Sequence, residues 1–92
     1  LWVAGGNDNN NISNIVYSND GKSWRHVLNF PFGTGLCRSI TLNNGKWIAG
    51  GDDSGNLANI WLSSNGMDWE KGKGKSFGTN KGSCQTVVCT KK

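Results

Sequence analysis

Several kinds of residue are scarce in this chain of 92 residues, and each scarcity excludes a class of function. The chain has one histidine, His26, and one tyrosine, Tyr17, and its only glutamate is Glu70. No Ser-His-Asp, Cys-His or paired-glutamate arrangement is visible, so we expect no catalytic site. No Cys-x-x-Cys pair or Cys/His cluster is present, so we expect no metal and no cofactor. No apolar run approaches the roughly 20 residues of a membrane-spanning helix, so we expect no membrane insertion.

The three cysteines, Cys37, Cys84 and Cys89, cannot all pair within one chain. Cys84 and Cys89 are five positions apart, so on one strand they would point to opposite faces. We therefore interpret all three as small buried thiols.

The net charge is +4, which permits an anionic partner. Basic residues gather near the end of the chain, where six of the ten are Lys71, Lys73, Lys75, Lys81, Lys91 and Lys92. The chain has no Arg-rich run and no nucleic-acid-binding motif, so we expect no nucleic acid partner. The first three of these lysines fall near a predicted outermost strand. Lysines there guard an exposed edge against pairing, and an anion-binding patch is the alternative interpretation.

Glycine and tryptophan are abundant, and they occur in an internal repeat. The chain has 14 glycines and five tryptophans, a composition typical of short strands joined by tight turns. Residues 2–6, Trp-Val-Ala-Gly-Gly, recur as Trp-Ile-Ala-Gly-Gly at residues 47–51. Phe-Gly-Thr recurs from residues 32–34 to 77–79, and between these positions the offset stays at 45 residues without a gap. This period lies in the range of β-propeller blades, each built from four strands.

The two ends of the chain join in phase with the repeat. Cys37 lies ten residues before Trp47, and a count from Cys84 through Lys92 to the first residue again reaches Trp2 after ten steps. The phase predicts one repeat at about 1–36, a second at about 37–83, and a last strand within 84–92 that completes the blade begun at residue 1. Propellers have typically 4–8 blades, so two blades cannot close a ring. We expect several copies to close it, three copies first and four second, or the chain to be a piece of a larger propeller.

Four strands are predicted in each repeat from β-branched and aromatic residues between turn residues. The first is near 38–42 and 85–89, and the second is at 46–50 and 1–5. The third is at 14–18 and 59–63, and the fourth is at 24–28 and 69–73. The fold class is therefore all-β, with two four-stranded antiparallel blade equivalents, one of them split between the two ends of the chain.

Residues 17–24, Tyr-Ser-Asn-Asp-Gly-Lys-Ser-Trp, carry a resemblance to a known motif. They resemble the Asp-box hairpin of the bacterial neuraminidase repeat and of sialidase-like propellers, and residues 63–69 form a second copy with Asn in place of Asp. The resemblance implies an extracellular, surface or virion location, and it implies that the box is a folding element. The box residues that it makes structural are Ser18, Asp20, Gly21, Trp24, Ser63, Gly66 and Trp69.

Sialidase activity is not implied, because those enzymes use an arginine cluster, a tyrosine nucleophile and acidic partners. This chain has only Arg25 and Arg38, and its one tyrosine lies inside the box. The indoles of Trp2 and Trp47 are also expected in the core. Trp61 replaces Val16 at its repeat position, so it is the tryptophan whose place in the core is least expected.

The long loops of the repeat are where ligand binding is expected, because functional residues concentrate on loops held by a rigid scaffold. Amide and carboxylate groups suit sugar hydroxyls, and the two phenylalanines would supply an aromatic face. The candidate binding residues are Asp8, Asn9, Asn10, Asp52, Asp53, Asn56, Phe32 and Phe77. The alternative interpretation is that Asn, Asp and Gly are simply common in loops. Calcium binding by Asp52 and Asp53 is not favoured, because the ligand spacing matches no known loop.

Two functions stay open at this stage. The first is a non-catalytic, lectin-like recognition module that binds carbohydrate and gains multivalency from ring symmetry. The alternative is a structural module that assembles with itself, such as a piece of a virion or surface protein. A sialidase-like hydrolase fragment is the third and least favoured interpretation. The expected partners are copies of the chain itself and, for the first function, glycans.

Overall fold

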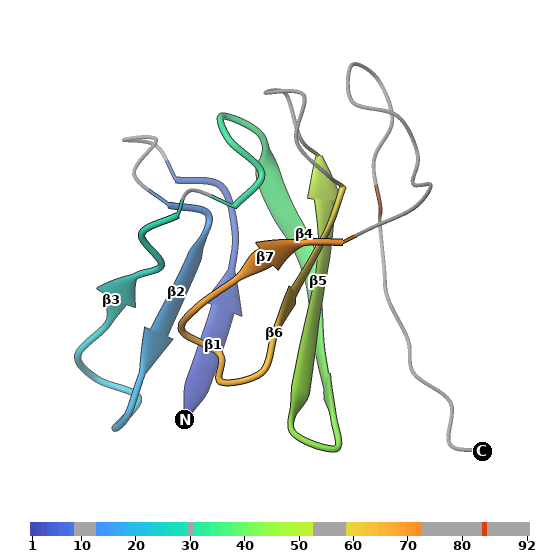
Figure 1. Ribbon diagram of the computed structural model, residues 1–92. Coiled ribbons are helices and arrows are strands. Elements are labelled where there is room, and N and C mark those ends of the chain that lie inside the picture. Colours follow the sequence, from blue (N-terminus) through green and yellow to red (C-terminus); the bar gives the residue numbers. More distant parts are fainter. Residues whose placement is uncertain (9–12, 30, 53–58, 73–83, 85–92) are drawn as a thin grey trace.

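The computed structural model describes residues 1–8, 13–29, 31–52, 59–72 and 84. Within these residues the chain is all-β, with two antiparallel sheets and no helix (Figure 1). The described part accordingly holds no helix with the length and apolar character needed to cross a membrane. The predicted all-β class is confirmed, whereas the arrangement of the sheets as propeller blades stays a prediction.

Each sheet is a meander in which neighbouring strands are consecutive in the chain. Sheet 1 is ordered β1 (Trp2–Gly5), β2 (Ile15–Ser18) and β3 (Arg25–His26). Sheet 2 is ordered β4 (Leu36–Asn43), β5 (Lys46–Asp52), β6 (Ile60–Ser63) and β7 (Glu70–Lys71). The strands predicted in these regions and their antiparallel order are confirmed, although β3 and β7 are shorter than predicted. The predicted strand at 85–89 lies outside the described residues.

The same hydrogen-bonding pattern occurs in both sheets, shifted by 45 residues. Trp2 pairs with Ser18 between β1 and β2, and Trp47 pairs with Ser63 between β5 and β6. A further backbone bond recurs with its acceptors 45 residues apart and its donors 47 residues apart. The Cys37 amide donates to the Gly6 carbonyl at 3.0 Å, and the Cys84 amide donates to the Gly51 carbonyl at 3.0 Å. The sequence repeat therefore coincides with repeated backbone geometry, including the bond accepted by a glycine directly after β1 and at the corresponding place in β5.

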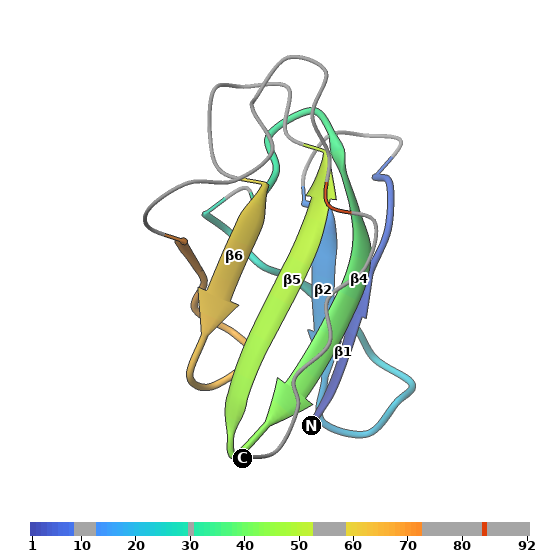
Figure 2. The same cartoon turned by 90° about the vertical axis from the view of Figure 1, so that its right-hand side faces the viewer.

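The hydrophobic core lies between the two sheets, which stack face to face (Figure 2). Alternate residues of a strand point to opposite faces, so strand pairing defines each face. The inner face of sheet 1 carries Val3, Gly5, Ile15 and Tyr17. The inner face of sheet 2 carries Ile40, Trp47, Ala49 and Trp61. The opposite sides are called the outer faces below.

Gly5 allows the closest approach of the sheets, between β1 and β4. A Cβ atom built on Gly5 would overlap the Cys37 thiol and would lie 3.0 Å from Ile40 Cδ1. Only a residue without a side chain fits there, which explains the glycine at this strand position.

The burial of the tryptophans differs between the two sheets, and this corrects the prediction that the indoles of Trp2 and Trp24 are buried. Trp61 and Trp69 are each 3% exposed and belong to the core, although Trp61 was the tryptophan least expected there. Trp2 is 60% exposed and Trp24 is 43% exposed, so the prediction that their indoles are buried is wrong. The physical reason is position in the stack. Trp2 lies on the outer face of sheet 1, which no other described strand covers. Trp24 falls on the same side by alternation, because it precedes Arg25, which pairs with Tyr17 of the inner face. Their counterparts Trp47 and Trp69 are on the covered side of sheet 2.

The β2–β3 and β6–β7 turns are built by the same side-chain contacts. In the first, Ser18 Oγ accepts from the Gly21 amide at 2.8 Å, and Asp20 Oδ1 accepts from the Lys22 and Ser23 amides at 2.8 and 2.9 Å. These backbone donors lower the pKa of the Asp20 carboxyl from its ordinary value.

In the second turn Ser63 and Asn65 take the places of Ser18 and Asp20. Ser63 Oγ accepts from the Gly66 amide at 2.7 Å, and Asn65 Oδ1 accepts from the next two turn amides at 2.9 and 2.8 Å. Gly21 and Gly66 have φ of 78° and 80°, a left-handed conformation that favours glycine. The amide oxygen of Asn65 thus replaces a carboxylate oxygen without changing the turn.

Two of the three cysteines are described, and both are buried. This confirms the expectation of buried thiols for Cys37 and Cys84, while Cys89 lies outside the described residues. Burial raises the pKa of the Cys37 thiol to about 12, so it is protonated at neutral pH.

Candidate functional site

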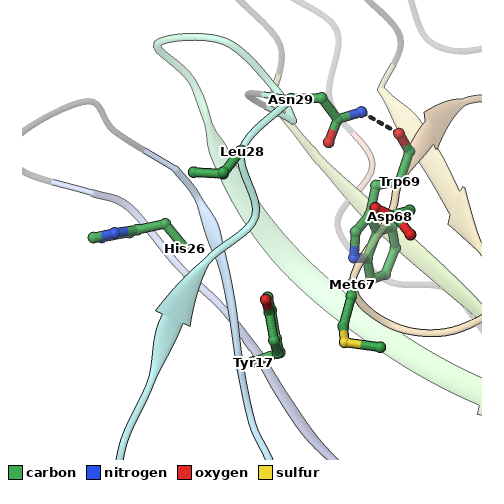
Figure 3. A pocket seen from close by; sticks show the side chains of 7 residues that line it. All are labelled: Tyr17, His26, Leu28, Asn29, Met67, Asp68 and Trp69. Atoms are coloured by element: carbon green, nitrogen blue, oxygen red, sulfur yellow. Dashed lines mark hydrogen bonds between the residues drawn. The ribbon is translucent and has the colours of Figure 1, made fainter.

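A cleft of about 440 Å³ lies between sheet 1 and the turn that leads into β7 of sheet 2. Its volume is within the range of small-ligand sites, roughly 300–1,000 Å³. It is lined by Tyr17, His26, Leu28, Asn29, Met67, Asp68 and Trp69 (Figure 3).

The wall from sheet 1 is formed by β2, β3 and the residues that follow β3. Tyr17 is half-buried on β2, and its ring stands between the sheets in Figure 3. The imidazole of His26 points away from the opposite wall, so it lies at the rim of the cleft. Leu28 is 85% exposed and presents apolar surface to the cleft.

The wall from sheet 2 is formed by three consecutive residues, the last two of the β6–β7 turn and Trp69 directly after them. Trp69 packs in the core and its Nε1 donates to the Gly66 carbonyl at 3.0 Å, so its indole forms a rigid floor. Asp68 is exposed, and its Oδ2 accepts from Asn65 Nδ2 at 2.9 Å. Asn29 joins the two walls, because its side-chain amide donates to the Trp69 carbonyl. These contacts fix the width of the cleft in the isolated chain.

Most residues that line the cleft differ from their counterparts in the other repeat. Tyr17 corresponds to Leu62, Asp68 to Ser23 and Met67 to Lys22, whereas Trp69 corresponds to Trp24. Residues that the strand and turn pattern requires recur in both repeats. The cleft residues that differ between the repeats are therefore not explained by the requirements of the fold.

Five of the eight binding residues predicted from the sequence lie outside the described residues. These are Asn9, Asn10, Asp53, Asn56 and Phe77. The other three are Asp8, Asp52 and Phe32, and the structure gives each of them a different surrounding.

Phe32 does not offer a free aromatic face, which corrects the prediction from the sequence. Its side chain is fully buried, and its ring centroid lies 6.1 Å from that of Trp61 at an interplanar angle of 55°. Phe32 has a φ of 65°, which turns the chain inward between the two sheets. It therefore anchors the connection to β4 in the core.

Asp8 organises the loop that follows β1. Its Oδ2 accepts from the Ser13 amide at 2.7 Å and lies 3.9 Å from His26 Nε2. The buried Asn14 side chain accepts from the Asp8 amide at 3.0 Å and donates to the Pro31 and Gly33 carbonyls at 3.1 and 3.0 Å. Asp8 also lines a second hollow of about 280 Å³, which opens beside the outer face of sheet 1.

Asp52 is paired with Arg38 across β4 and β5. Arg38 Nε donates to Oδ1 at 3.1 Å and Nη2 donates to Oδ2 at 3.0 Å, a bidentate arrangement. This pairing raises the pKa of the Arg38 guanidinium from its ordinary value. Both oxygens of Asp52 are thus already engaged by a cation of the same chain. Among the described residues, no group of three His, Cys, Asp or Glu side chains is placed to hold a metal ion.

The cleft was missed by reasoning from the sequence, because that reasoning looked only in the long loops. Two signals pointed to it. The chain's one tyrosine stands on a strand where the other repeat has leucine, and Met67-Asp68 replaces Lys-Ser after the turn. Positions that break a repeat are therefore informative even when they fall within strands and short turns.

Fold and cleft together define an all-β protein with two stacked antiparallel sheets and a ligand-sized cleft at their junction. No protein-family model, curated protein or solved structure matches the chain.

Proposed function

We propose that the chain is a non-catalytic recognition module built of β-propeller blades, and that it binds carbohydrate in the cleft between its two sheets. The blade assignment is supported by the four-stranded antiparallel meander of sheet 2 and by the backbone pattern that sheet 1 repeats at an offset of 45 residues. The resemblance of both turns to Asp-box hairpins agrees with it, since Ser18 and Asp20 hold the first turn together.

The observation that carries the binding proposal is the lining of the cleft. Sugars present hydroxyl groups on one side and apolar C–H surfaces on the other. They are bound by planar polar groups placed beside an aromatic ring. The cleft offers the Tyr17 ring and hydroxyl on one wall, the Asp68 carboxylate on the other and the Asn29 amide at their junction. Leu28 and Met67 add exposed apolar surface.

The chemistry of the lining favours binding over hydrolysis. Among the described residues that line the cleft, Asp68 is the one carboxylate. Glycoside hydrolysis ordinarily needs two carboxyl groups on opposite sides of the scissile bond. A single carboxylate that accepts a hydrogen bond from Asn65 is better suited to hold hydroxyl groups in place.

A glycan array with variants taken from the chain's own repeat tests the proposal. Tyr17→Leu and Asp68→Ser each introduce the residue of the other repeat, so both are expected to keep the fold, which circular dichroism checks. We expect the binding signal of each variant to be at least ten times lower than that of the wild type. Asp52→Asn introduces the residue found at position 7 and serves as the control outside the cleft, where binding is expected to persist.

The outcomes separate the competing sites and functions. Binding that is lost in Asp52→Asn and kept in Tyr17→Leu would move the site to the loops after β1 and β5. Absence of binding by the wild-type chain to every glycan on the array would contradict the recognition proposal. It would favour the alternative, a structural module whose activity is self-assembly, for which a separate observation is given below.

A further inference from the structure

We propose that the chain associates head to tail with further copies of itself, through the outer face of sheet 1 in one copy and the outer face of sheet 2 in the next. This association does not depend on ligand binding in the cleft.

The first reason is that the two outer faces are counterparts of the two faces that already pack together. An offset of 45 residues takes Trp2, Ala4 and Val16 on the outer face of sheet 1 to Trp47, Ala49 and Trp61 on the inner face of sheet 2. The backbone register at the paired positions is the same in both sheets. The outer face of sheet 1 therefore shares its backbone register, a tryptophan and an alanine with a surface that is buried inside the chain, and has valine in place of Trp61.

The same offset relates the other pair of faces. It takes Val3, Ile15 and Tyr17 on the inner face of sheet 1 to Ile48, Ile60 and Leu62 on the outer face of sheet 2. Aliphatic residues are kept at the first two positions, and the third changes from tyrosine to leucine. The outer face of sheet 2 thus resembles the surface on which the core of the chain is built.

The second reason is that residues of the outer faces are more exposed than their buried counterparts. Trp24 is 43% exposed while Trp69 is 3% exposed, and Ala4 is exposed while Ala49 is fully buried. Ile60 is half-buried while Ile15 is fully buried. Trp2 and Trp24 place two large indoles on one face, which is typical of surfaces that bind another protein.

The third reason is the outer edge of β1 in sheet 1, which no other described strand occupies. In sheet 2, β5 pairs with β4 on one side and β6 on the other. The corresponding strand β1 pairs with β2, and no other described strand pairs with its remaining edge. A strand edge of this kind presents backbone amides and carbonyls that another chain can pair with, which favours association on this side of sheet 1.

Two different faces in contact make the interface heterologous. Such interfaces produce closed rings when the rotation between copies closes and filaments when it does not. Two sheets per copy give a ring with an even number of sheets, and three copies give six, within the range of propellers.

The chain's own lysines provide a cross-linking test. Within one chain, Leu1 Cδ2 lies 2.5 Å from the position of a Cβ atom on Gly66, next to Met67. At an offset of 45 residues, the position equivalent to Leu1 is Lys46 and the position equivalent to Met67 is Lys22. In the proposed interface, these two lysines of different copies should therefore lie as close as Leu1 and Met67 do within one chain. We expect a lysine-reactive cross-linker to join Lys46 of one copy to Lys22 of another. Mixing ¹⁴N- and ¹⁵N-labelled protein identifies the cross-link as one between copies, and Lys22→Arg serves as the control that removes it.

Variants of the two faces test whether the interface is heterologous. Ala4→Arg blocks the outer face of sheet 1, and Leu62→Arg blocks the outer face of sheet 2, with Thr41→Arg on β4 as a substitute if Leu62→Arg does not fold. Each variant alone is expected to be monomeric, and an equimolar mixture is expected to form a one-to-one dimer and nothing larger. A wild-type chain that stays monomeric, or a mixture that does not associate although the wild type does, would overturn the proposal.

Discussion

Asp20 and Asn65 hold the same place in two turns and differ only in charge. The Oδ1 atom of each side chain accepts hydrogen bonds from two backbone amides. It also accepts one from the hydroxyl of the serine two residues earlier. The charged form of Asp20 is favoured by its amide donors, so its pKa is lower in the folded chain than its ordinary value of 3.8. Asn65 cannot titrate. The two turns therefore show the same Oδ1 contacts with a carboxylate in one and without a carboxylate in the other.

Asp20→Asn is expected to reduce the dependence of stability on acid pH. A carboxyl whose pKa is lowered by folding stabilises the folded state above its unfolded pKa, and the contribution is lost as pH falls through the folded pKa. The wild type should therefore lose stability more steeply than the variant below about pH 4. Urea unfolding midpoints at pH 7 and pH 3 measure the difference. Equal pH dependence in the two proteins would contradict the role assigned to the carboxylate.

Ser18→Ala is expected to weaken the first turn. The buried Ser18 hydroxyl accepts from the Asp20 and Gly21 amides at 3.2 and 2.8 Å, and alanine leaves both without this acceptor. These bonds are only partly buried, so their loss is expected to cost about 0.5–1.5 kcal/mol, which urea unfolding resolves. Ser23→Ala is the matched control, because the Ser23 contact shown in the turn is made by its backbone amide. A loss of similar size in both variants would indicate a general sensitivity of the turn.

At the scale of the secondary-structure elements, β1 of sheet 1 packs closely against β4 of sheet 2, where Gly5 faces Cys37 and Ile40. Gly6 follows directly, and a Cβ atom built on it would have no neighbour within 4 Å. Adjacent glycines thus serve different purposes: the first permits contact between the two sheets, and the second lies in open space.

Gly5→Ala is expected to destabilise the chain by about 1–3 kcal/mol, because the added methyl group overfills the space between the sheets. Gly6→Ala is the matched control and should stay within about 0.5 kcal/mol of the wild type. Denaturant unfolding followed by circular dichroism measures both. Cys37→Ala in the Gly5→Ala background is expected to restore part of the loss, since it removes the thiol that the new methyl group meets. Independent, additive effects of the two substitutions would contradict this contact.

The order of the strands was predictable from the sequence, but their burial was not. Turn residues and β-branched runs recur at a fixed offset, so one meander predicts the other. Burial depends on what lies above a face, and equivalent positions in two stacked sheets face different neighbours. Trp24 and Trp69 have the same local sequence signal, yet only Trp69 is covered. The cleft could not be predicted from the sequence for a similar reason. Its two walls are formed by segments about 50 positions apart in the chain, which only the stacking of the sheets brings together.

At the scale of the whole molecule, stacking joins the two sheets inside the chain and leaves one face of each sheet without a described sheet against it. The core holds Trp61 and Trp69 between the sheets, whereas Trp2 and Trp24 stand on the outer face of sheet 1. A stack of repeated units buries its surface by adding neighbours, so units at the two ends are left incomplete.

Trp24 and Trp69 are expected to respond differently to the same substitution. Trp69→Ala removes a core side chain and should cost about 3–5 kcal/mol of folding stability. Trp24→Ala should cost less than about 1 kcal/mol in a dilute, monomeric sample, and it should weaken association between copies. Urea unfolding and sedimentation at several concentrations separate the two effects. Similar folding losses for both variants in the monomer would contradict the assignment of Trp24 to an interface.

Native mass spectrometry of the wild-type chain tests the central claim, that the stacking of sheets within the chain continues between chains. The claim predicts species at integer multiples of 9.9 kDa, with the trimer as the closed ring of six sheets. A single species at 9.9 kDa, unchanged as the concentration is raised, would contradict it.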